Sequence, residues 1–141
     1  MKKRLSFLIV VCTVSLLSVP GFALDLNGIW NVTVTDSITH CAGAGKGKVG
    51  DYTIALTQKG DKITIIGQAS QTRYVGEAKQ GAPNHVHVHS TDNLHGGYVT
   101  ELVDIDFDND QTGKGGSVWR WSDGLYQCGG SYKFTLHKIQ P

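Results

Sequence analysis

The chain has 141 residues, with 13 lysines and arginines against 12 aspartates and glutamates and a formal net charge of +1. A chain of this length suits one domain that is large enough to bury a core. It has no basic excess to neutralise phosphates, so nucleic-acid binding is not expected.

The first segment, MKKRLSFLIVVCTVSLLSVPGFA, has the layout of a secretory signal peptide. A basic start and an apolar stretch are followed by the small residues Gly21 and Ala23, which favour cleavage after Ala23. The apolar stretch is shorter than the roughly 20 residues of a spanning helix, which favours a signal over a membrane anchor. No second hydrophobic run follows in the sequence, so no membrane span is expected after cleavage. We therefore expect a signal peptide at 1–23, a single domain at 24–141 and a secreted or periplasmic bacterial protein.

Eight short segments of alternating hydrophobicity follow, separated by turn signals. They are 28–36, 51–58, 62–68, 72–78, 85–90, 97–108, 116–122 and 126–139. This pattern is typical of an antiparallel sandwich or barrel. Sequential strands are expected to pair, and closure removes exposed edges. We expect an all-β, eight-stranded antiparallel up-and-down barrel, with a β-sandwich as the alternative.

The first predicted strand carries a G-x-W motif at Gly28 and Trp30. It resembles the entry motif of the lipocalin and avidin-like barrels. The late segment VWRWSDGLYQCGGSYKFTL is similar to the C-terminal pattern of small secreted bacterial lipocalin-like proteins without an assigned function. The resemblance implies that Trp30 closes one end of the barrel beside a basic residue, either Arg120 or Lys138. Biotin is not carried over, because the avidin pattern is not traceable beyond G-x-W.

Two cysteines, Cys41 and Cys128, remain after the signal segment. In an oxidising compartment an isolated pair most often forms one disulfide. We expect that bond here, and the alternatives are two free thiols or metal ligands.

Histidines alternate with valines in the segment NHVHVHS. Because side chains alternate across a strand, His85, His87 and His89 share one face. The interior of a small barrel is filled by apolar side chains, so we expect the valines inside and the histidines in solvent.

An outward histidine ladder can still bind a metal. Residues i and i+2 lie about 6.6 Å apart, so two imidazoles can share one Zn or Cu ion if a third ligand lies on a neighbouring strand. His85 and His87, with Asp104 across the hairpin, are the candidate ligands. An ordinary solvated strand face is the other interpretation.

Aromatic side chains are expected to point into the barrel from the late strands. Trp119, Trp121, Tyr132 and Phe134 either fill a core or line an open cup that binds a small apolar or aromatic molecule. Glu101 shares their inward direction, which places it at the barrel mouth or beside a partner such as Arg73.

Catalytic signatures are not found: the chain has neither a G-x-S-x-G elbow nor a phosphate-binding loop. We expect a non-catalytic protein that binds a small, partly apolar ligand at the open end of the barrel, without a cofactor. The alternatives are a protein-interaction module, such as a proteinase inhibitor that engages a secreted protein through AGAGKGKVG, and metal binding by the histidine strand.

Overall fold

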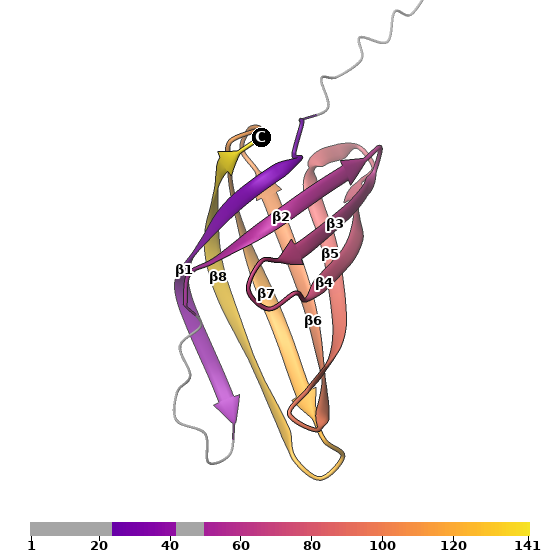
Figure 1. Ribbon diagram of the computed structural model, residues 1–141, viewed down its shortest axis with the longest axis vertical. Coiled ribbons are helices and arrows are strands. Elements are labelled where there is room, and N and C mark those ends of the chain that lie inside the picture. Colours follow the sequence, from indigo (N-terminus) through magenta and orange to yellow (C-terminus); the bar gives the residue numbers. More distant parts are fainter. Residues whose placement is uncertain (1–23, 42–49) are drawn as a thin grey trace, which may run out of the picture.

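The computed structural model describes residues 24–41 and 50–141, and its strands close into one eight-stranded antiparallel barrel (Figure 1). Each strand pairs with its sequence neighbours, and the first strand also pairs with the last. The strands are β1 (Gly28–Cys41), β2 (Tyr52–Lys59), β3 (Lys62–Gly67), β4 (Arg73–Lys79), β5 (Ala82–Leu94), β6 (Gly97–Phe107), β7 (Thr112–Ser122) and β8 (Gln127–Gln140). The prediction of an all-β up-and-down barrel is confirmed, and the fold is consistent with the lipocalin-like type.

The predicted signal peptide, residues 1–23, lies outside the described residues. In the part of the chain that is described, no helix has the length and apolar character needed to cross a membrane.

The strands differ in length, and this shapes the two ends of the barrel. β2, β3 and β4 have six to eight residues, whereas β1 and β5 to β8 have 11 to 14. In Figure 1 the long strands run on past the short ones towards the lower end. We call that end, with the β5–β6 and β7–β8 turns, the open end, and the opposite end, where β1 begins, the closed end.

Three strands are longer than the sequence predicts. β1 continues to Cys41 and β5 to Leu94, while β7 already begins at Thr112. Each extension is polar or glycine-rich and resembles a loop locally, but a neighbouring strand pairs with it over its length. Gly115 shows why glycine is needed there, because a Cβ at this position would approach the Phe134 ring to 2.6 Å.

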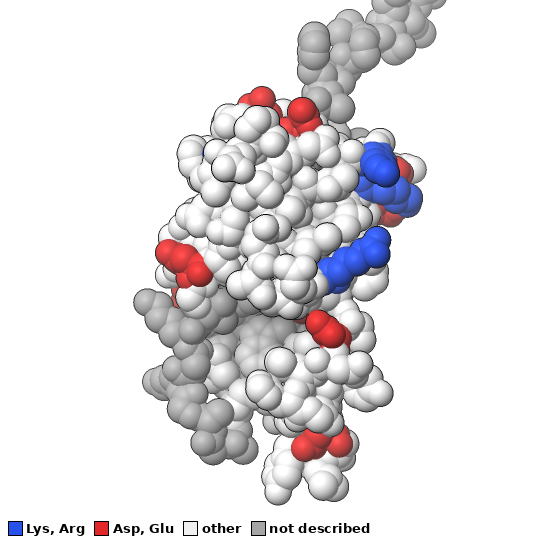
Figure 2. All heavy atoms as spheres, viewed as in Figure 1, with Lys and Arg blue, Asp and Glu red and all other residues white. Residues whose placement is uncertain are grey.

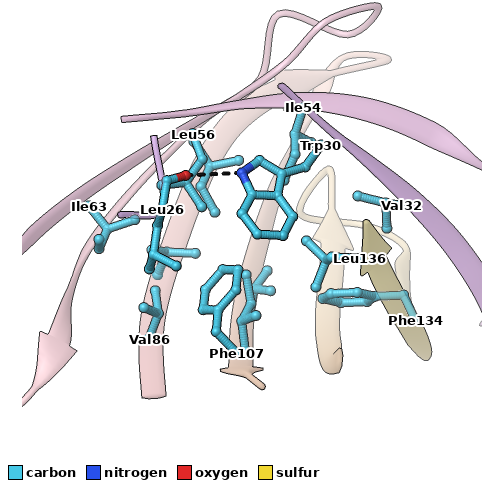
Figure 3. Close-up of a cluster of buried hydrophobic side chains, with 14 of the residues drawn as sticks. Leu26, Trp30, Val32, Ile54, Leu56, Ile63, Val86, Phe107, Phe134 and Leu136 are labelled. Atoms are coloured by element: carbon cyan, nitrogen blue, oxygen red, sulfur yellow. Dashed lines mark hydrogen bonds between the residues drawn. The ribbon is translucent and has the colours of Figure 1, made fainter. Parts of the chain in front are cut away.

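The closed end is filled by a hydrophobic core around Trp30 (Figure 3). The Trp30 indole is fully buried, donates its Nε1 hydrogen to the Leu26 carbonyl at 3.0 Å and meets Phe107 edge-on at 5.1 Å between ring centroids. Lys138, its register partner on β8, holds its Nζ 5.2 Å from the centre of the indole ring. Of the two basic residues that the resemblance offered for this role, Lys138 occupies it.

Cys41 and Cys128 lie opposite one another where β1 and β8 approach the open end. They are joined as a disulfide, with 4.5 Å between the Cα atoms and a sequence separation of 87 residues. The predicted pairing is therefore seen, and a pair at this distance fits an extracellular protein.

Candidate ligand-binding site

A layer of hydrogen-bonded polar side chains crosses the interior of the barrel. Glu101 on β6 accepts a hydrogen bond from Tyr74 on β4 at 2.6 Å and one from Tyr132 on β8 at 2.5 Å. Ser117 on β7 also donates to the Glu101 carboxylate, and the Tyr52 hydroxyl on β2 lies 3.1 Å from that of Tyr132. We call these five residues the hydroxyl layer.

Register and side-chain alternation bring the layer together. Ser117 and Tyr132 are direct cross-strand partners, and Glu101 occupies an inward position on the other neighbour of β7. Strand alternation sends Tyr74 inwards and leaves Arg73, the residue before it, exposed on the outside. Of the two alternatives for Glu101, a partnership with Arg73 is therefore not seen, and hydroxyl groups take the place of the guanidinium.

Burial controls the protonation of the three phenols. Loss of hydration raises the pKa of Tyr52 to about 12, with a further upward contribution from the charge of Glu101. The pKa values of Tyr74 and Tyr132 are raised still more, first by burial and then by neighbouring negative groups that include Glu101. The phenols are therefore neutral hydrogen-bond donors throughout the physiological range.

A pocket of about 550 Å³ opens on the side of the layer that faces the open end. Its lining residues are Leu94, His95, Val99, Glu101, Trp119, Trp121, Cys128 and Tyr132. On the closed-end side, the core around Val32, Ile54 and Phe134 leaves a void of only about 20 Å³. Since one water needs roughly 10–15 Å³, that half of the barrel is packed and the other half is hollow.

Glycines on the inner surface make room for the two indoles of the pocket. A Cβ at Gly130 would approach Trp119 to 2.9 Å, and one at Gly97 would approach Trp121 to 2.8 Å. The Trp121 Nε1 also donates to the Leu94 carbonyl at 2.7 Å. Both rings therefore rest against backbone, and that of Trp121 is additionally fixed by a hydrogen bond.

Four of the predicted ligand-binding residues, Trp119, Trp121, Tyr132 and Glu101, line this pocket. Phe134 does not, because it lies two positions further along β8 and is buried in the packed half. The sequence interpretation missed Val99 as a lining residue, although it occupies an inward position on β6, as Glu101 does, and alternation alone indicates it.

The histidine strand has the orientation expected of an ordinary barrel wall. Val86 and Val88 are fully buried, and the histidine side chains point outwards. Hydrogen bonds join His85 Nδ1 to Asp106 at 2.7 Å and His87 Nδ1 to Asp104 at 2.8 Å.

The proposed metal ligands are near one another but are engaged in these pairs. The Nε2 atom of His85 lies 3.6 Å from Asp104, so the expected proximity of these two residues is seen, although the direct cross-strand partner of His85 is Asp106. Among residues 24–41 and 50–141 there is no group of three or more His, Cys, Asp or Glu side chains that fits a metal ion. Metal binding here stays a hypothesis drawn from the sequence.

The segment predicted to engage a proteinase, AGAGKGKVG, falls almost entirely on residues 42–49, outside the described residues. The inhibitor interpretation therefore stays a prediction.

A second hollow, of about 530 Å³, lies beside the open end, is lined by both polar and apolar surface of β1 and of β6 to β8, and shares Trp121 and Cys128 with the first pocket. Its lining residues include Tyr98, Thr100, Arg120, Ser122, Gln127 and Gly129. Charged side chains on the face seen in Figure 2 occur singly or in small groups, separated by uncharged surface. The pocket above Glu101 combines aromatic walls with a polar floor and is the stronger candidate.

A scan against protein-family models and searches of the curated proteins and of the solved structures found no match to this chain. The interpretation of the site therefore depends on its own chemistry.

Proposed function

We propose that this protein binds a small, partly apolar molecule in the pocket at the open end of the barrel, without catalysis. The observation that carries the proposal is the pocket of about 550 Å³ between the Trp119 and Trp121 indoles and the Glu101–Tyr132 floor. Small-molecule sites typically measure about 300–1,000 Å³ and combine apolar walls with a few polar groups that fix orientation.

The walls supply affinity and the floor supplies orientation. Apolar surface removed from water contributes roughly 25 cal/mol per Å², and large aromatic rings offer much of it at little conformational cost. The carboxylate of Glu101 is already held by Tyr74, Tyr132 and Ser117, so little side-chain freedom is lost when a ligand arrives. These hydrogen bonds hold the polar groups to one another, which favours a recognition role over proton transfer.

The proposal includes an exported protein, secreted or periplasmic. It is supported by the signal-like start of the sequence and by the Cys41–Cys128 pair, because disulfides persist mainly in oxidising compartments.

The proposal is tested by filling the pocket. Val99→Trp adds an indole to the lining and is expected to reduce the affinity for N-phenyl-1-naphthylamine, a neutral fluorescent probe, at least tenfold. Val118→Trp makes the same exchange on the outer surface of β7, where the side chain is exposed, and should leave the affinity unchanged.

Fluorescence titration of the natural protein and both variants gives the affinities, and thermal unfolding confirms that each is folded. Equal affinity in all three proteins would place the probe elsewhere and contradict the proposal. So would a natural protein that binds neither this probe nor other small aromatic compounds.

A further inference from the structure

The carboxylate at the floor of the pocket has acceptor capacity that the described residues do not use. A carboxylate offers about four lone-pair sites. Ser117 and Tyr132 donate to Oε1 of Glu101, and Tyr74 alone donates to Oε2. These donors therefore leave one acceptor position on Oε2 unused, on a side chain that lines a pocket whose surface is otherwise apolar.

Glu101 also has no counter-charge among residues 24–41 and 50–141. Every ion pair of these residues lies on the outer surface, and none includes Glu101. Hydroxyl donors stabilise the carboxylate without neutralising it. Because its apolar walls lower the local dielectric, the pocket presents a negative charge whose attraction for a cation is stronger than in water.

The walls of the pocket suit the same kind of ligand. Indole faces attract organic cations, and this attraction grows when the cation is desolvated. Trp119 rests against Gly130 and Trp121 against Gly97, so each ring has one side covered by backbone while the residue itself lines the pocket. His95 is the one other titratable group of the pocket lining besides Tyr132 and Glu101, and it lies on the β5–β6 turn at the rim.

We propose that the ligand is a small organic amine in its ammonium form, with the ammonium on Glu101 and its hydrocarbon part between Trp119 and Trp121. This inference rests on the proposed function and adds the charge and the chemical class of the ligand.

Three probes that share one hydrocarbon body test it. Phenethylammonium, 2-phenylethanol and 3-phenylpropanoate present a cation, a neutral hydroxyl and an anion to the floor. Calorimetric titration of the natural protein is expected to give the tightest binding for phenethylammonium, by about tenfold over the alcohol, because charge-assisted hydrogen bonds are roughly twice as strong as neutral ones. The anionic probe, 3-phenylpropanoate, should bind most weakly.

Glu101→Gln keeps the shape of the side chain and removes its charge, and it replaces one of the two accepting oxygens with a donating amide nitrogen. The tenfold preference for the ammonium probe should disappear in this variant, while the alcohol still binds. Asp104→Asn removes a carboxylate from the outer face of the same strand and should keep the preference.

The ranking of the three probes by the natural protein is decisive even if Glu101→Gln fails to fold. Equal affinity for phenethylammonium and 2-phenylethanol, or tighter binding of 3-phenylpropanoate, would overturn the amine inference and leave the proposed function in place. Failure of all three probes together with N-phenyl-1-naphthylamine would overturn both.

Discussion

Glu101 shows how single side chains divide the interior of this barrel. A carboxylate inside an apolar barrel is costly unless hydrogen bonds satisfy it, and three hydroxyl groups from three other strands do so here. Of these residues, Glu101 and Tyr132 line the floor of the pocket, so the hydrogen bonds that stabilise the charge also hold it in place for a ligand.

The raised pKa values of the buried phenols predict a loss of stability in alkali. Both states keep the Tyr52 proton below pH 10, its ordinary value, but between about pH 10 and 12 only the folded state holds it. Stability is thus fully present below pH 10 and falls as the pH rises through that window, by about 1.4 kcal/mol per pH unit for each retained proton. The pKa values of Tyr74 and Tyr132 are raised further, so these two phenols extend the loss of stability to higher pH.

Denaturant unfolding at pH 9, 10 and 11, with tyrosinate absorbance recorded in parallel, measures this effect. Tyr52→Phe is expected to make the decline between pH 10 and 11 shallower than in the natural protein. An unfolding free energy that stays constant from pH 9 to pH 11 would show that the phenols are not held neutral by the fold.

The sequence predicts part of this arrangement at the residue scale. Alternation with Val103 and Ile105 correctly sends Glu101 inwards. Its partners are not predictable in this way, because they lie 16 to 31 residues away on other strands, whose mutual register depends on closure of the whole barrel. Arg73 was an attractive partner by charge, but it stands on the outward face of β4.

At the scale of an element, the two faces of β5 have different roles: the inner face packs in the core, and the outer face makes polar contacts. The valines are fully buried, whereas the histidines pair with aspartates in solvent. The two faces should therefore differ sharply in their contributions to stability.

Val88→Ala is expected to lower the unfolding free energy by about 2 kcal/mol, through lost burial and the cavity that remains. His87→Ala, the matched change on the neighbouring outward position, should cost less than about 1 kcal/mol, since exposed ion pairs contribute little. Urea denaturation at pH 7 distinguishes the two. Equal costs would mean that β5 does not present its valines to the core.

The turn between β5 and β6 is tighter than the sequence indicates. His95 and Gly96 both have positive φ values, of 50° and 79°, the pattern of a two-residue hairpin turn. Asn-Gly or Asp-Gly would have signalled this turn clearly, whereas His-Gly within the polar TDNLHG segment resembled a longer loop.

At the scale of the whole molecule, unequal strand length produces the pocket. The number and order of the strands followed from alternation and turn signals, which are local. The lengths did not, because the extensions of β1, β5 and β7 are polar or glycine-rich and form strands only through pairing with their neighbours. The local sequence pattern therefore could not predict that the closed end is packed and the open end is hollow.

The disulfide is expected to stabilise the whole barrel and the pocket together. A link across 87 residues contributes on the order of 4 kcal/mol in the chain-entropy model. Replacing Cys41 and Cys128 with serine should lower the unfolding free energy by that order and weaken probe binding, because Cys128 lines the pocket.

Denaturant unfolding and probe titration of the double variant, compared with the reduced natural protein, check this expectation. A double variant as stable as the oxidised natural protein would show that pairing of β1 with β8 alone secures the open end.

The position of the hydroxyl layer has a consequence for how this molecule tolerates change. Leu94 and Trp121, on the hollow side, do not belong to the buried cluster that Trp30 and Phe107 anchor on the other side. Tyr132 and Trp119 link the two sides, because both line the pocket while Tyr132 belongs to that cluster and Trp119 packs against it. Side chains that line the pocket without belonging to the cluster can therefore be exchanged to suit a different ligand, while the buried core at the closed end keeps the barrel folded.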